Sequence, residues 1–142
     1  MRFSRLCGLL LVMAPFASGC GGSSPDLCHL SGTVTFKGQP LSAGRILFLP
    51  DSTKGNSGQA GYAEIKEGAY DTRRKGAAAS GGALIVRIDG YDGKTSATNL
   101  VGQPLFLNYE IQIDASGTHS TKDFVVPVEA GNELPKVSGE PP

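Results

Sequence analysis

Two strand patterns separated by a tight turn constrain the fold of this chain most strongly. From Leu30 to Lys37 the apolar residues occupy one parity and the hydroxyl residues the other: Leu30, Val34 and Phe36 against Ser31, Thr33 and Thr35. A period of two is typical of a half-buried β-strand. The next run, 45–49, is nearly all apolar and ends at Pro50, which cannot donate a ladder hydrogen bond. Two strands joined by the turn 37–40 predict the start of a β-sandwich.

Similar patterns recur further along the chain. Strands are predicted over 62–66 and 69–71, joined by the two-residue turn Glu67-Gly68, and then over 83–89, 105–114 and 122–127. The stretch 71–82 predicts a loop or a short helical turn. The 20 glycines and 9 prolines fit short strands and tight turns, and 142 residues with 39% hydrophobic content fit one core. The predicted class is all-β.

The N-terminal segment has the pattern of a secretory signal. Arg2 and Arg5 precede an apolar run from Leu6 to Phe16. This run is too short to cross a bilayer, which needs about 20 apolar residues in a helix. Residues 1–19 are therefore predicted to be a signal peptide.

The sequence Ala17-Ser18-Gly19-Cys20 resembles the lipobox of bacterial lipoproteins, although the family prefers Leu where Ala17 stands. The resemblance implies cleavage between Gly19 and Cys20 and lipid modification of Cys20. Gly21 replaces the Asp associated with inner-membrane retention, which implies an outer-membrane or cell-envelope location. The alternative is ordinary cleavage after Gly19 with an unmodified cysteine.

Residues 20–29 are predicted to form a flexible tether, because Gly, Ser and Pro dominate them. If Cys20 carries lipid, Cys28 is left as a single thiol. If Cys20 keeps its thiol, a Cys20–Cys28 disulfide can form in an oxidising compartment. Removing Arg2 and Arg5 with the signal leaves 11 basic and 13 acidic residues, a net charge of −2. This balance lacks the excess of positive charge that is typical of nucleic-acid-binding proteins. Residues 129–142 are predicted to be a disordered tail.

The segment from Tyr91 to Pro104 has no sustained periodicity and is long for a connection within a domain. It is the first candidate for a binding site, with Tyr91, Asp92 and Asn99 as its candidate residues. Tyr62 and Tyr91 are the aromatic side chains that could stack on a sugar or peptide.

No catalytic residue, metal site or cofactor is assigned. His29 and His119 fall outside the predicted core strands and lack zinc-ligand spacing. Asp89, Asp92 and Glu110 are calcium candidates without a complete ligand loop, and turn formation is the alternative reading. The triplet 73–75 could contact anionic envelope polymers or be a solvated loop.

The order of these strands resembles small bacterial lipoproteins with a carboxypeptidase regulatory-like, or transthyretin-like, domain. The resemblance covers about 30–128 and rests on the segments 31–34, 38–41, 46–50, 63–70, 86–93 and 123–127. It implies a seven-stranded Greek-key β-sandwich, related to Ig-like folds, and no activity. The Tyr-Arg-Gly-Ser ending of 5-hydroxyisourate hydrolases in the wider group is absent from this sequence.

The sequence thus predicts a secreted, lipid-anchored, non-enzymatic structural or interaction module of the cell envelope. Its predicted partners are the membrane, through the lipid, and an unknown envelope protein or glycan. The alternative is a carbohydrate- or peptide-binding module that uses the loop from Tyr91 to Pro104.

Overall fold

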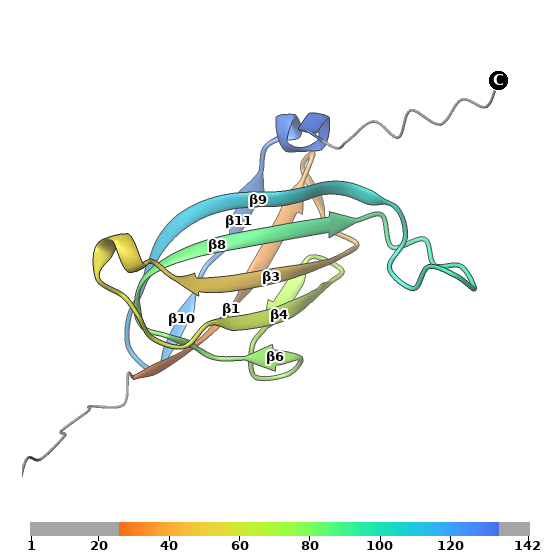
Figure 1. Cartoon of the computed structure of the whole chain (residues 1–142). Coiled ribbons are helices and arrows are strands. Elements are labelled where there is room, and N and C mark those ends of the chain that lie inside the picture. The colour runs from red at the N-terminus through yellow and green to blue at the C-terminus, as the bar shows by residue number, and fades with distance from the viewer. Residues whose placement is uncertain (1–25, 134–142) are drawn as a thin grey trace, which may run out of the picture.

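The structure is a computed structural model that describes residues 26–133 (Figure 1). It is built from eleven strands and two short 3₁₀ helices, and no α-helix occurs within this range, so the all-β prediction is confirmed. The first half of the domain contains β1 (Leu27–Phe36), β2 (Gln39–Pro40), β3 (Ala43–Pro50), η1 (Ser52–Lys54), β4 (Gly61–Lys66) and β5 (Ala69–Asp71). The second half contains β6 (Gly76–Ala77), β7 (Ala79–Ser80), β8 (Gly82–Tyr91), β9 (Pro104–Ala115), β10 (His119–Thr121), β11 (Phe124–Val126) and η2 (Val128–Glu133).

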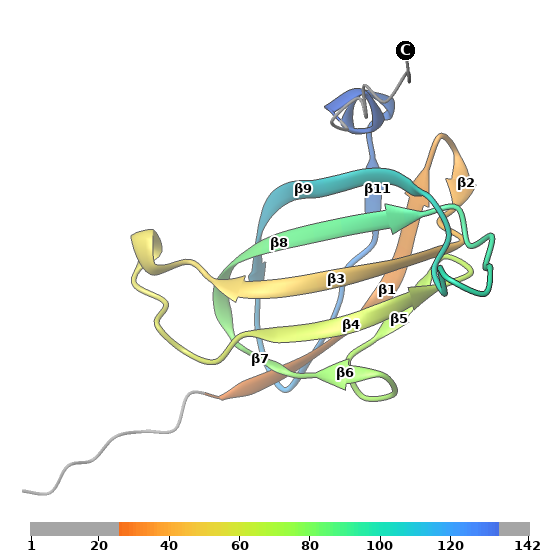
Figure 2. The ribbon, with the colours of Figure 1, turned by 45° about the vertical axis from the view of Figure 1, so that its right-hand side comes forward.

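All strands belong to one curled sheet. Its main order is β10-β1-β5-β4-β3-β8-β9, and the other four strands pair with β1 or β4. Most pairs are antiparallel, whereas β10 and β11 run parallel to β1. The sheet curls so that β1, β10 and β11 lie behind the layer formed by β4, β3, β8 and β9 (Figure 2). The hydrophobic core fills the space between them.

The alternation in the sequence correctly predicts which side chains face this core. Leu30 and Val34 of β1 have no exposed surface and Phe36 is 6% exposed, while Thr33 between them faces solvent. The same parity buries the three alternating apolar side chains of β8, which are Leu84, Val86 and Ile88. At about 25 cal/mol per Å² of apolar surface, burial of this kind is the main favourable contribution to folding.

Two hairpin turns shape one end of the sheet. Lys37 and Gly38 have φ angles of 53° and 73°, and Glu67 and Gly68 have 50° and 79°. Positive φ at both central positions fits the type I′ turn, whose twist matches that of the flanking strands. The turns lie close together, because a Cβ on Gly68 would be 2.7 Å from the Cβ of Pro40. The predicted turns at 37–40 and 67–68 are therefore confirmed.

β1 changes its parallel partner from β10 to β11 near Gly32. A Cβ at this glycine would lie 2.0 Å from the carbonyl oxygen of Lys122, so only glycine allows the approach. Beside it, Asp123 Oδ1 accepts hydrogen bonds from the backbone N–H of Thr33 at 2.7 Å and from its hydroxyl at 2.9 Å. The Lys122 carbonyl also accepts the hydroxyl proton of Tyr70 at 2.7 Å.

Several predicted boundaries were wrong. β1 begins at Leu27, inside the expected tether 20–29, because Leu27 and Cys28 pair with Ser80 and Ala79 of β7. The stretch 71–82 contains the strands β6 and β7 rather than a helical turn. The predicted start of the disordered tail at residue 129 was also wrong, because η2 extends to Glu133 and its Ala130 packs against the core.

The predicted signal peptide, Gly19, Cys20 and the end of the tail lie outside residues 26–133. Within that range, no helix is long and apolar enough to cross a membrane.

Candidate functional site

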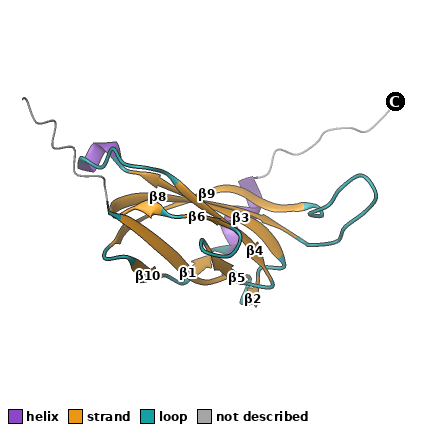
Figure 3. Ribbon diagram, turned by 90° about the horizontal axis from the view of Figure 1, so that it is seen from below, coloured by secondary structure: helices purple, strands orange, loops and turns teal. Residues whose placement is uncertain are grey.

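A groove of about 1230 Å³ lies between the loop 92–103 and the ends of β3 and β4. Its floor comes from the start of β3 and the end of β4, one wall comes from Pro40 and Glu67 in the two hairpin turns, and the loop forms the opposite wall. Figures 1 and 3 show this loop at the opposite end of the domain from the start of β1. Of the three residues expected in a binding loop, Tyr91 and Asp92 line the groove.

Asp92 closes the base of the loop. Its Oδ1 accepts the backbone N–H of Lys94 at 3.0 Å and that of Gln103 at 2.9 Å. The Lys94 N–H is the main cause of a lowered Asp92 pKa. Burial opposes it as the second-largest effect, and the Gln103 N–H and the Lys94 charge lower the pKa further. Asp92 is thus a negatively charged closure of the loop at neutral pH.

Asn99 organises the tip of the loop and is not among the residues that line the groove. Its Oδ1 accepts the N–H groups of Val101 at 3.1 Å and Gly102 at 3.0 Å, and its Nδ2 donates to the Gly102 carbonyl at 2.8 Å. The backbones of Ser96 and Asn99 also form an isolated β-bridge. The loop therefore has a defined internal structure. Asn99 was predicted as a binding residue, and the structure gives its side chain a scaffolding role.

Leu100 and Val101 are the exposed residues of this loop that the sequence reasoning missed. Leu100 is 81% exposed and Val101 is 46% exposed, and both line the groove. Their signal in the sequence was two adjacent apolar residues within a segment that lacks periodicity. Large apolar side chains that a loop holds in solvent are typical of contact sites.

The floor of the groove carries charges of both signs. Arg45 lies 3.7 Å from Asp89, and Glu64 lies 3.3 Å from Lys75. The Arg45 side chain is 60% exposed, so this ion pair leaves the guanidinium open to a ligand. Surface pairs of this kind contribute little to stability.

The three calcium candidates do not meet. Asp89 accepts the N–H of Asn108 at 2.8 Å, Asp92 closes its loop, and Glu110 pairs with Arg87. Each carboxylate therefore has its own structural partner. Within residues 26–133 no group of three or more His, Cys, Asp or Glu side chains could hold a metal ion.

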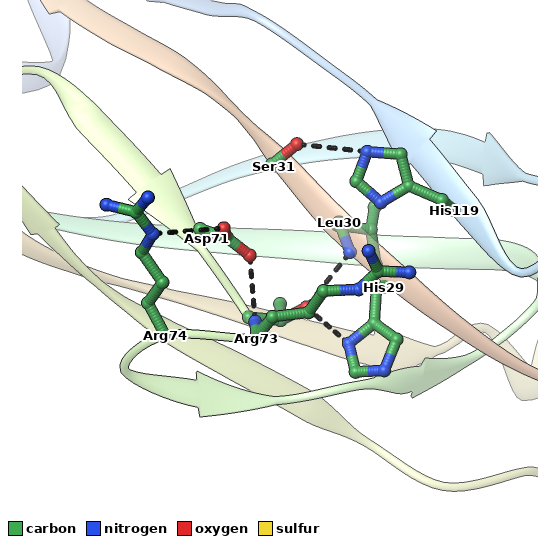
Figure 4. Close-up of polar contacts among 8 residues, drawn as sticks. His29, Leu30, Ser31, Asp71, Arg73, Arg74 and His119 are labelled. Carbon is green, nitrogen blue, oxygen red and sulfur yellow. Dashed lines mark hydrogen bonds and ion pairs between the residues drawn. The ribbon is translucent and has the colours of Figure 1, made fainter.

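The two histidines were wrongly placed outside the strands. His29 in β1 and His119 in β10 lie directly opposite each other in the parallel pair of these strands (Figure 4). His29 Nδ1 lies 3.3 Å from the hydroxyl of Thr72, and His119 Nε2 lies 3.4 Å from that of Ser31. Figure 4 also shows the Arg73 side chain, from the turn after β5, beside His29.

Comparisons of the chain with protein-family models, with curated proteins and with solved structures found no match. The groove is therefore interpreted from its own geometry.

Proposed function

We propose that the protein is an extracytoplasmic lipoprotein whose β-domain is a non-enzymatic binding module of the cell envelope. Lipid on Cys20 would anchor it at the outer membrane or another membrane of the cell envelope, and the groove beside the loop 92–103 would hold its partner. The observation that carries this proposal is the defined groove, whose wall presents Leu100 and Val101 to solvent. Confinement by an anchor raises the effective concentration of such a site toward neighbouring envelope proteins.

The position of the groove supports this arrangement. The start of β1 lies beside the end of β9, because Cys28 Sγ is 3.9 Å from the carbonyl of Ser116. The loop 92–103 leads into the beginning of β9, twelve residues away along that strand. A tether from Cys20 to Asp26 would therefore enter at the end opposite to the groove, leaving the groove accessible to an envelope partner.

The resemblance supports a more specific fold. We propose that the curled sheet is a seven-stranded Greek-key sandwich of the carboxypeptidase regulatory-like type, with the shortest strands as additions to it. The buried faces of β1 and β8 and the turns at 37–40 and 67–68 occupy segments that carry the resemblance.

A polypeptide partner fits the groove better than a glycan. Leu100 and Val101 offer apolar contacts, and the charges of Arg45 and Glu64 can pair with side chains or backbone groups of an extended segment. The second candidate is a carbohydrate stacked on Tyr91, which lines the same groove but is only partly exposed.

The anchor is tested by metabolic labelling with a palmitate analogue. We expect label on the wild-type protein and none on Cys20→Ala. Equal labelling of the two proteins would contradict the lipoprotein assignment. It would not bear on the proposed binding role of the groove.

The groove is tested by photo-crosslinking in the protein's own membranes, followed by identification of the crosslinked species. A photoreactive residue at Thr95, which lines the groove, should crosslink to a defined envelope protein. Adding the double change Leu100→Ser and Val101→Ser should abolish that product. Val125→Ser is the matched control, because Val125 is 76% exposed on β11, away from the groove. Binding of a glycan array that depends on Tyr91 would favour the second candidate instead.

A further inference from the structure

The outer edge of β9 is open. β9 is the last strand of the main sheet order and pairs only with β8 within the described part of the chain. η2 contacts β9 near its beginning, where a Cβ on Gly131 would lie 3.0 Å from the carbonyl oxygen of Leu105. The stretch from Tyr109 to Ala115 extends beyond this contact. A long edge strand with unpaired backbone groups is a template for another strand.

Side chains along this edge alternate between apolar and polar. Tyr109, Ile111 and Ile113 face the core side of the sheet, yet Ile111 remains 37% exposed and the other two are only partly buried. The intervening residues on the opposite face are Glu110, Gln112 and Asp114. An added strand would cover the apolar row without displacing any described element.

We propose that two copies of this protein pair through β9, antiparallel, about a two-fold axis at Ile111. Ile111 then faces Ile111 of the second copy, and Tyr109 faces Ile113. On the other face Glu110 lies opposite Gln112, and the pairing ends before the bulge at Asn108, whose φ is 56°. Directly opposed cross-strand residues are the unit of sheet stabilisation, and this register opposes no like charges. The pairing depends neither on the lipid anchor nor on the groove.

Neighbouring registers are disfavoured. A shift by one residue would place the apolar row opposite the polar row. An axis at Glu110 would oppose this residue to its own copy, and an axis at Gln112 would oppose Glu110 to Asp114. Both arrangements bring carboxylates together, whereas the axis at Ile111 does not.

Lys54 adds a complementary charge to the same register. Its Nζ donates to Gln112 Oε1 at 3.1 Å, so the ammonium group lies beside Gln112. Because Gln112 would face Glu110 of the second copy, Lys54 of one molecule would approach that carboxylate. Glu110 is 48% exposed and accessible to this contact. The two-fold axis would create the contact twice.

Cysteine crosslinking of the full chain tests the register. In the proposed pairing the Cα atoms at position 111 lie about 5 Å apart across the axis, within disulfide reach. Those at position 113 lie about 14 Å apart, because four residues along the strands and the spacing between the strands separate them. With copper phenanthroline as oxidant, Ile111→Cys should form a disulfide-linked dimer well above the wild-type background, and Ile113→Cys should not. Equal dimer yields at the two positions, or no dimer from Ile111→Cys, would overturn the proposal.

Lys54→Glu tests the charge contact in solution. In detergent-solubilised full chain, sedimentation equilibrium should show a dimer whose dissociation constant rises about tenfold in this variant, because two attractions become two repulsions. Lys94→Glu is the matched control on the remote loop, and circular dichroism verifies that both variants are folded. A purely monomeric wild type, or equal dissociation constants for both variants, would refute the pairing.

Discussion

Asp92 and Gln103 exchange two hydrogen bonds at the base of the loop 92–103. The N–H of Asp92 donates to the Gln103 carbonyl at 2.9 Å, and the N–H of Gln103 donates to Asp92 Oδ1 at 2.9 Å. The first bond joins the two backbones, whereas the second depends on a carboxylate. The loop that forms one wall of the groove is therefore closed by a titratable group.

This closure should weaken in acid. The pKa of Asp92 lies below its ordinary value of 3.8 in the folded protein, mainly because of the Lys94 N–H. A folded pKa below the unfolded one contributes stability above pH 3.8 that is lost as the pH falls through the folded pKa. Amide NMR shifts of Lys94 and Gln103 should titrate together below pH 3.8. Asp92→Asn should abolish this titration, and its persistence in that variant would contradict the assignment.

Gly102→Ala should open the same loop. Gly102 has a φ of 91°, and a Cβ there would lie 2.0 Å from Asp92 Oδ1. Gly117→Ala is the control, because Gly117 has a φ of 71° but no atom within 4 Å of the added Cβ. Both changes should cost about 1 kcal/mol through backbone strain. Only Gly102→Ala should speed hydrogen exchange across 93–103, and equal exchange in the two variants would count against the closure.

Tyr70→Phe should destabilise the fold by about 1–2 kcal/mol at pH 7, because the partly buried carbonyl of Lys122 loses its hydrogen bond. Burial raises the pKa of Tyr70 above its ordinary value of 10.0, with a smaller contribution from the Asp123 charge. The unfolded chain therefore releases this proton first, and the stability that Tyr70 contributes falls as the pH rises above 10. Denaturant unfolding should show the wild-type advantage shrinking between pH 8 and pH 11. A constant difference would refute this role.

Cys28 should be unreactive in the native protein. It has no exposed surface, and burial raises the pKa of its thiol above 9.0 against an opposing effect of the Lys122 charge. A thiol-specific reagent at pH 8 should modify Cys28 only after denaturation. Mass spectrometry of the peptide that contains Cys28 measures this directly, and rapid native labelling would show that the start of β1 opens.

The sequence predicted the long strands well because their signal is local. Leu84, Val86 and Ile88 alternate within five residues, and the Glu67-Gly68 turn requires only its own backbone preference. The alternation of apolar and polar residues in β9 could also be predicted from the sequence, but the partial exposure of its apolar side chains could not. Ile111 is 37% exposed because β9 ends the sheet, which is a property of strand order rather than of sequence.

The errors arose where distant segments determine the structure. Leu27 and Cys28 join a strand because residues 79 and 80 lie beside them, about fifty positions later. His119 joins β10 for the same reason, through β1. The loop 92–103 was identified by its length, whereas the scaffolding role of Asn99 follows from its hydrogen bonds to Val101 and Gly102.

The closure between Asp92 and Gln103 also has an evolutionary consequence. The two bonds that join these residues are made at the end of the sheet, and the side-chain hydrogen bonds of Asn99 stay within the intervening loop. The other wall of the groove comes from the independent turns at 37–40 and 67–68. Residues between the two closing positions can therefore change in length and composition without altering the core. Selection could thus redirect the specificity of such a domain by loop exchange while its scaffold stays constant.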